Sequence, residues 1–216
     1  MEKKLSRKLC LFALIIISTT LTLTGCGAVS SAINSVIPEI DNLVKLDGTS
    51  VEATVGNGRA VISGNISKSA TFADTSLPQA DNLKTMKLRQ SLSQDVTVKM
   101  PGSAALPASF SLSNITLAVT LSDAANNASA SATLAGPVTF TRQGTTSTYR
   151  ANIAAVEITN ITFSAAAFTT ARTIITSAPS PNTALGKLSF DADDTQLPSG
   201  TKLTFTFSGG KAKVEL

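Results

Sequence analysis

Apolar and polar residues alternate one by one along most of the chain from residue 49 onward. The clearest alternating segments are VEATV (51–55), DVTVKM (95–100), ASASATLA (128–135), PVTFTR (137–142) and KLSF (187–190). A period of two places every second side chain on the same face of a β-strand. About a dozen such segments, separated by Gly, Pro and Asn, predict an all-β, mainly antiparallel fold, a β-sandwich or a barrel-like domain.

The C-terminal segment 201–216, TKLTFTFSGGKAKVEL, alternates on both sides of a Gly-Gly pair. Two glycines between alternating runs predict a β-hairpin with a two-residue turn at Gly209-Gly210. In the predicted register Ser208 pairs with Lys211. The apolar pairs that then share one face are Phe207 with Ala212, Phe205 with Val214 and Leu203 with Leu216.

Two segments, FSLSNITL (110–117) and VEITNITF (156–163), share a pattern in which the alternation shifts by one residue at an asparagine. Such a shift turns a strand inside out unless an extra residue is accommodated, so Asn114 and Asn160 are predicted β-bulges. The segments GPVTF (136–140) and GKLSF (186–190) follow at a similar offset. We therefore consider an internal duplication of the β domain, with GNIS (64–67) as a degraded third copy.

Upstream of the β pattern, residues 28–48 (AVSSAINSVIPEIDNLVKLDG) have apolar residues at three- and four-residue intervals. This spacing, with Pro38 opening its second half and Gly48 after its end, predicts one or two short amphipathic helices. The apolar stripe would lie on a membrane surface or pack across an edge of the β domain. We favour packing, because the polar face lacks a run of lysines.

The N-terminal stretch MEKKLSRK contains four basic residues and one acidic residue, and the short apolar stretch LFALIIISTTLTL follows it. This is the layout of a secretory signal peptide, and the apolar stretch is too short to span a membrane comfortably. The next residues, Leu23-Thr24-Gly25-Cys26, resemble the lipobox of bacterial lipoproteins. The resemblance covers residues 1–26. It implies cleavage before Cys26 and attachment of acyl chains to that cysteine, which suffice for stable anchoring.

The expected organisation is a signal peptide (1–25), a lipidated tether with a short helix (26–48) and a single β domain (49–216). The resemblance implies a membrane-anchored location in the bacterial cell envelope, facing the periplasm or the exterior. Gly27 stands where lipoproteins kept in the inner membrane tend to have Asp, which leaves the outer membrane open.

Removing residues 1–25 changes the charge balance from 18 Lys plus Arg against 14 Asp plus Glu to 14 against 13. A nearly neutral mature chain lacks the basic footprint of a nucleic-acid-binding protein. The chain has no histidine, which excludes Ser-His-Asp and Cys-His catalysis and the usual His-based metal sites. We expect neither a cofactor nor an enzymatic activity.

Three carboxylates, Asp191, Asp193 and Asp194, make a weak calcium candidate in FDADDTQLPSGTK. The EF-hand pattern fails, because Gln196 and Lys202 stand where glycine and glutamate belong, so a solvated turn is favoured. Ser199–Lys202 and Ser208–Lys211 match the Ser-x-x-Lys spacing of penicillin-recognising enzymes, but both fall at predicted turns. Glu157 has no second carboxylate to complete a glycosidase pair.

The most basic region of the mature chain contains Lys84, Lys87, Arg89 and Lys99. It could meet anionic lipid headgroups or an acidic partner. We favour a charged face that protects an edge strand from aggregation.

The sequence thus predicts a lipid-anchored, non-enzymatic envelope protein with a binding or structural role toward another envelope component. The alternative is an envelope carrier of lipid or another apolar ligand in a β cavity. An enzyme of unknown type ranks last.

Overall fold

The computed structural model describes residues 34–35, 37–56, 59–61, 68–69, 84–176, 183–192 and 195–215. The chain divides into two compact units, residues 1–38 with Leu216 and residues 39–215. The strands β1 to β13 and the helix α3 all lie in the second unit.

The second unit is an all-β domain built from antiparallel pairings, which confirms the predicted fold class. The predicted segments 51–55, 95–100, 128–135, 137–142 and 187–190 overlap β2, β6, β8, β9 and β12. The ends of the first four differ from those of their strands by at most two residues, and 187–190 lies inside β12. The strands are β1 (Ile40–Asp41), β2 (Ser50–Gly56), β3 (Arg59–Val61), β4 (Lys68–Ser69), β5 (Thr85–Leu92), β6 (Asp95–Lys99), β7 (Ser109–Ser122), β8 (Asn127–Thr133), β9 (Val138–Arg142), β10 (Thr148–Ala151), β11 (Val156–Phe163), β12 (Thr183–Ala192) and β13 (Lys202–Glu215).

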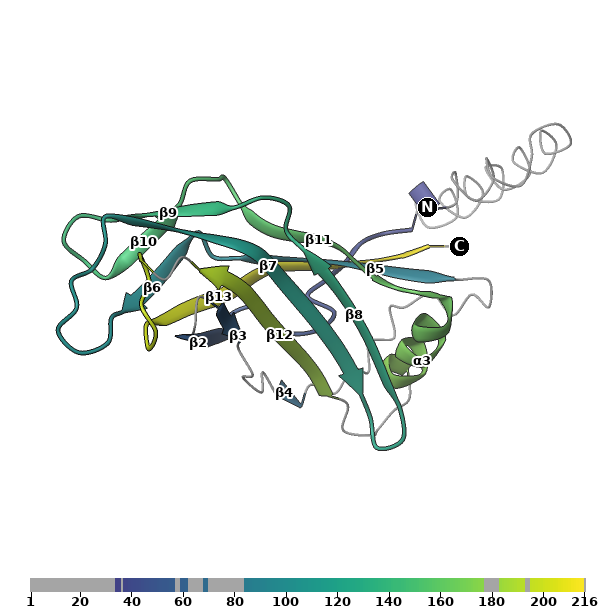
Figure 1. Cartoon of the computed structure of the whole chain (residues 1–216). Coiled ribbons are helices and arrows are strands. Elements are labelled where there is room, and N and C mark those ends of the chain that lie inside the picture. The colour runs from purple at the N-terminus through teal and green to yellow at the C-terminus, as the bar shows by residue number, and fades with distance from the viewer. Residues whose placement is uncertain are drawn as a thin grey trace, which may run out of the picture. The chain divides into compact units, whose positions relative to one another are not determined.

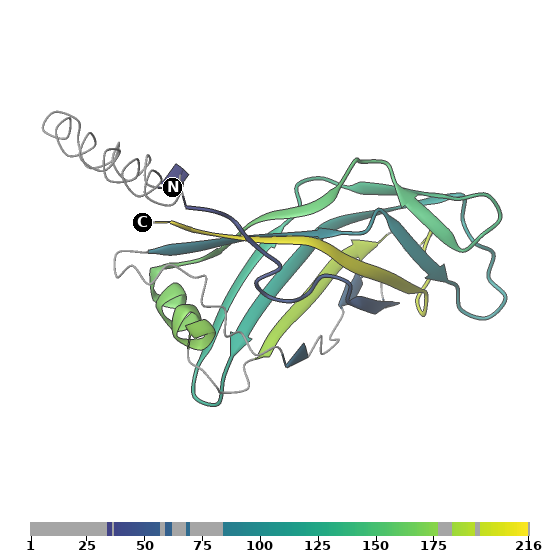
Figure 2. The same cartoon turned by 180° about the vertical axis from the view of Figure 1, so that it is seen from behind.

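The strand order is barrel-like. Pairings lead from β13 through β2, β3, β12, β7, β9 and β10 to β6. Strand β6 then pairs with residues 202–204 of β13, whose other edge pairs with β2. The second half of β13 lies between β5 and β1, and β11 extends this part of the sheet beyond β5. Figure 2 shows β13 in yellow, running along the length of the domain.

At one end of the domain the sheet parts between β8 and β11. Within the described residues, β8 pairs with β7 and β11 pairs with β5, and the two strands lie near each other without a ladder between them. Helix α3 (Ala165–Thr176) packs against both. Figure 1 shows α3 beside β8, at the end of the sheet away from β9 and β10.

Helix α3 was not predicted from the sequence. Its segment, AAAFTTARTIIT, is rich in Thr and Ile, whose branched side chains lower helix propensity. Phe168, Ala171, Ile174 and Ile175 are nevertheless buried. Their three- and four-residue spacing is the signal that identifies this face. Tertiary burial therefore outweighs the β preference of the segment.

Inward-facing residues of the strands form the core. Five aromatic side chains, each at most 1% exposed, gather at the end of the domain where β7, β9, β10, β12 and β13 come together: Phe110, Phe140, Tyr149, Phe190 and Phe205. Their ring centroids are 5.0–6.5 Å apart in stacked, tilted and edge-on pairs. The hydroxyl of Tyr149 donates a hydrogen bond to the carbonyl of Pro107 at 2.6 Å. This cluster fills the interior where the strand order is barrel-like.

The predicted hairpin at Gly209-Gly210 is wrong, because residues 202–215 form one continuous strand. Ser208 pairs with Ser91 and Lys211 with Arg89, so both glycines lie opposite Gln90. Two residues opposite one define a β-bulge, and Gly209 has the positive φ (58°) of the bulge type that begins with a left-handed glycine. Strands β5 and β6 offer β13 a continuous partner, so its halves pair with them and not with each other.

The predicted bulges at Asn114 and Asn160 are confirmed. Asn114 has φ of 52° where the β7–β12 register shifts, and Asn160 has φ of 61° where the β11–β5 register shifts. The two sites share a further detail, since Thr116 and Thr162 each donate a side-chain hydrogen bond to the asparagine carbonyl at 3.1 Å. After each bulge the apolar residues face the core again.

The helical interpretation of residues 28–48 is wrong for residues 40–48. Asn34 and Ser35 are helical, but Ile40–Asp41 form β1 on β13, and a turn-containing segment follows. Leu43, Val44 and Leu46 of that segment are buried, so its apolar residues pack against the domain. Backbone pairing with β13 provides the partners that a helix would have supplied internally. The segment GNIS (64–67) lies outside the described residues.

Candidate functional site

Four cationic side chains project from the outer face of β5 and β13 around a surface pocket. In the register of these strands, Lys87 lies opposite Lys213 and Arg89 opposite Lys211, with the pair Leu88–Ala212 between them. We call these four residues the cation square. The pocket has a volume of about 160 Å³, and its lining is Glu39, Lys87, Leu88, Arg89, Thr159, Asn160, Lys211, Ala212 and Lys213.

The bulge in β13 places two of these cations on the outer face. Leu203, Phe205 and Phe207 face the core, and strict alternation would send residues 209, 211 and 213 inward as well. The extra residue at Gly209-Gly210 shifts the phase by one, so Ala212 and Val214 are buried while Lys211 and Lys213 face outward. On the other side of β5, the bulge at Asn160 lies opposite Arg89.

Carboxylates border the square and pair with three of its members. Glu39 Oε2 is 2.8 Å from Arg89 Nη2 and 3.6 Å from Lys211 Nζ. Glu215 pairs with Lys87 at 2.7 Å. Glu157 lies 3.6 Å from Arg89, and Asp41 lies 3.5 Å from Lys211. The described residues give Lys213 no ion pair.

Four carboxylates border the four cations, so the cluster is close to neutral, and an added oxyanion would exchange with one of these carboxylates. Like charges placed directly opposite each other on neighbouring strands repel, and both cross-strand pairs of the square are like-charged. The bordering carboxylates relieve this only in part, because pairs whose side chains are about 40% exposed, such as Arg89–Glu39, are screened by water. Arg89 Nε is buried and has no hydrogen-bond partner among the described residues. The square can therefore bind an oxyanion by charge-assisted hydrogen bonds.

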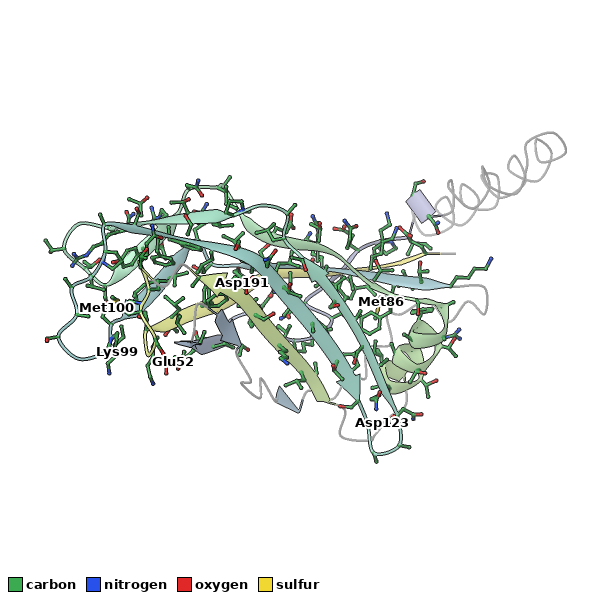
Figure 3. The ribbon with its side chains drawn as sticks, viewed as in Figure 1. Glu52, Met86, Lys99, Met100, Asp123 and Asp191 are labelled. Carbon is green, nitrogen blue, oxygen red and sulfur yellow. The ribbon has the colours of Figure 1, made fainter. Side chains whose placement is uncertain are left out.

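The predicted lipidation and calcium sites fall mostly outside the described residues, which is where Cys26, Asp193 and Asp194 lie. Asp191 is described near the end of β12 (Figure 3) and accepts a hydrogen bond from Asn114 Nδ2 at 2.7 Å. It lines a second surface pocket of about 310 Å³ with Ser111, Leu112, Ser113, Pro137 and Ala192. Across the described ranges no three His, Cys, Asp or Glu side chains gather as a metal site.

The residues of the predicted basic region lie on or beside different strands and do not form one surface. Lys87 and Arg89 belong to the square, whereas Lys99 ends β6 and lies opposite Lys202 of β13. The edge-strand interpretation is wrong, because β5 pairs with β11 on one side and with β13 on the other. Lys211, Lys213 and Glu39 were missed as partners of this region, since the hairpin interpretation paired β13 with itself.

The two Ser-x-x-Lys matches do not form nucleophile and base pairs. Lys202 Nζ pairs with Glu52 at 2.6 Å, away from the turn that holds Ser199. Ser208 is exposed beside the bulge, and Lys211 turns toward Glu39 and Asp41. Glu157 pairs with Arg89.

Shifted pKa values fall at three places outside the square. The hydrogen bond from Arg150 holds the pKa of Asp95 below its usual range, and Asp95 raises the pKa of Arg150. The pKa of Asp123, at the tip of the β7–β8 hairpin (Figure 3), is lowered first by the amide of Ala125 and then by the side chain of Asn126. Burial raises the pKa of Tyr149. Each shift has a structural partner or cause, so none of them identifies a further reactive group.

No protein-family model matches this chain, and no curated protein matches it. Of the helices in the described part of the chain, none is both long and apolar enough to cross a membrane.

Proposed function

We propose that this chain is a lipid-anchored, non-enzymatic protein of the bacterial cell envelope whose β domain binds an acidic envelope component through the cation square. The anchor part of the proposal rests on the order of basic start, apolar stretch and Leu-Thr-Gly-Cys ending at Cys26. The binding part rests on one observation, the grouping of Lys87, Arg89, Lys211 and Lys213 around a surface pocket.

Replacing Cys26 tests whether the chain is anchored by acyl groups on this residue. The wild-type chain is expected to label with a radioactive fatty acid and to sediment with membranes. Cys26→Ser should abolish the label, and once residues 1–25 are removed the chain should leave the membrane fraction, because a chain without its acyl groups loses about 0.8 kcal/mol of membrane affinity per methylene. Fatty-acid labelling of the Cys26→Ser chain would contradict the assignment of this residue.

A sedimentation assay with cell envelopes tests whether the cation square binds an acidic envelope component. The Cys26→Ser chain, freed of its own anchor, is mixed with washed cell envelopes and sedimented at low and high salt. Replacing the four cations of the square by Gln should remove the salt-sensitive part of the bound fraction. The matched control replaces four other exposed or half-buried cations, Lys45, Lys99, Arg150 and Lys187. Equal losses in the two variants would show that net charge matters and that the square does not.

A second candidate, a carrier of lipid or another apolar ligand, is favoured by the end of the domain where β8 and β11 part. Small side chains face the interior there, Ala128 and Ala130 on β8 and Ala184 on β12, and α3 packs against β8. Movement of this helix would expose an apolar interior lined by small residues. Native mass spectrometry of the Cys26→Ser chain tests it. A stoichiometric lipid-sized mass supports a carrier, and a bare polypeptide mass contradicts it.

A further inference from the structure

The four cations of the square surround one point on the sheet. Neighbouring strands lie about 4.8 Å apart, and residues two positions apart along a strand are about 6.7 Å apart. Lys87, Arg89, Lys211 and Lys213 are therefore the corners of a small rectangle centred on the Leu88–Ala212 pair. Each side chain is long enough to place its charged group over this centre, where the pocket lies.

One anion already reaches into this pocket. The carboxylate of Glu39 contacts Arg89 at 2.8 Å and Lys211 at 3.6 Å, and both contacts use the same oxygen, Oε2. Glu39 is about 40% exposed and comes from the segment just before β1, not from the sheet itself. Lys213, at the opposite corner from Arg89, has no ion pair with any described residue.

We propose that the cation square binds one phosphoryl group, as inorganic phosphate or as the phosphate of a lipid headgroup, in exchange with the carboxylate of Glu39. A tetrahedral phosphoryl group directs oxygens toward several corners at once. The planar carboxylate of Glu39 contacts two of the four cations, Arg89 and Lys211. A pocket of about 160 Å³ also suits a compact group of this kind. The inference rests on the proposed function, because it names the chemistry that the same surface binds.

The exchange is feasible because the contacts of Glu39 are those of a partly exposed ion pair. Displacing Glu39 leaves the strand ladder of β1 with β13 in place, since that ladder begins at Ile40. Glu39 therefore acts as an internal competitor, and removing its charge makes the site available. This gives the proposal a signature that general electrostatic attraction lacks, because one particular carboxylate sets the affinity.

The test is a titration of the ¹⁵N-labelled Cys26→Ser chain with sodium phosphate at constant ionic strength, followed by amide chemical shifts. Saturable shifts are expected at Leu88, Arg89 and Ala212. Glu39→Gln should tighten the apparent dissociation constant about two- to fivefold, the equivalent of an exposed ion pair. Lys213→Gln should weaken it by a similar factor. Lys187→Gln, an exposed lysine on β12, is the matched control and should leave it unchanged.

Two further arms identify the source of the phosphoryl group. Sodium acetate at the same ionic strength supplies a planar oxyanion, and vesicles of phosphatidylglycerol supply a phosphate ester on a surface. Saturation by inorganic phosphate indicates a free ligand. Sedimentation with the vesicles, lost in Lys213→Gln, without a response to inorganic phosphate indicates a headgroup. Both results support the proposal. Acetate binding as tightly as phosphate, no response in either phosphoryl arm, or no difference between Lys213→Gln and Lys187→Gln would overturn it.

These results are independent of the envelope experiment. Chains that bind envelopes through the square but fail every phosphoryl arm would retain the proposed function and lose this inference. Chains that bind phosphate through the square but fail to bind envelopes would retain this inference and contradict the proposed function.

Discussion

Gly210 donates its backbone N–H to both carboxylate oxygens of Asp47, at 2.9 and 3.1 Å. Gln90 Nε2 reaches the same carboxylate at 2.9 Å and the carbonyl of Ser208 at 3.0 Å. The bulge of β13 is thus tied to the segment that follows β1 and to the strand opposite. Because this bulge turns Lys211 and Lys213 outward, the polar cluster beneath it positions half of the cation square.

Gly210→Ala is expected to lower the free energy of unfolding by about 1–3 kcal/mol. An added Cβ would lie 2.7 Å from Gln90 Oε1, closer than real Cβ contacts, and 3.0 Å from Asp47 Oδ1, so these hydrogen-bonded side chains would have to move. Urea unfolding of the Cys26→Ser chain measures the loss. Ser208→Ala, at an exposed position of the same strand, should change stability by less than about 0.5 kcal/mol. Equal stability of the two variants would contradict the bulge geometry.

Asn160 tests the need for a left-handed residue in β11. Asn160→Val should destabilise the domain by about 1–2 kcal/mol more than Asn160→Gly, because φ of 61° places Cβ too near the following carbonyl oxygen and valine is branched there. Thr159→Val, one residue earlier at an exposed strand position, is the control and should be well tolerated. Thermal unfolding gives the melting temperature of each of the three variants and so ranks their stability. A tolerated valine at 160 would show that the bulge can move.

Tyr149 offers a pH prediction that a simple absorbance titration can check, since the chain has one tyrosine and no tryptophan. Burial raises the pKa of its hydroxyl above the ordinary value of 10.0. The folded state therefore holds this proton more tightly than the unfolded state. The stabilisation is fully present below pH 10 and is lost as the pH rises through the higher folded pKa. A folded chain in which Tyr149 is already half ionised at pH 10 would contradict the raised pKa.

The aromatic cluster should carry a large share of the stability of its end of the domain. Phe205 lies 5.4 Å from Phe190 and 6.5 Å from Phe140 between ring centroids. Phe205→Ala is expected to cost about 3–5 kcal/mol through lost burial and the cavity it leaves. Thr204→Ala changes the preceding residue, on the opposite face of the strand, and should lower the free energy of unfolding far less. Chemical unfolding distinguishes them, and a small loss for both would indicate a loosely packed interior.

Local pattern was sufficient for most of the longer strands and for two bulges, although it assigned Ile40–Asp41 to a helix. In β7 and β11 the shift in alternation at Asn114 and Asn160 is visible in the sequence, and asparagine tolerates the left-handed backbone that such a bulge needs. The same reasoning failed at Gly209-Gly210, because two glycines between alternating runs suit a hairpin turn and a bulge alike. The choice depended on whether β5 and β6 lay alongside β13, which no local pattern contains.

The sequence by itself determined which residues face inward, since alternation and the hydrophobic effect together assign each strand a buried side. The sequence is also the whole basis of the proposed anchor, because Leu23-Thr24-Gly25-Cys26 resembles a lipobox and the attachment of acyl groups stays a prediction. Only the tertiary structure decided that Ile40–Asp41 pair with β13 as a strand, that α3 forms where β8 and β11 part, and that Lys211 and Lys213 join Lys87 and Arg89. The strand pairings of β1 and β5 with β13 join segments more than a hundred residues apart, and α3 depends on packing against β8 and β11. The free energy of such contacts is not encoded in either segment alone.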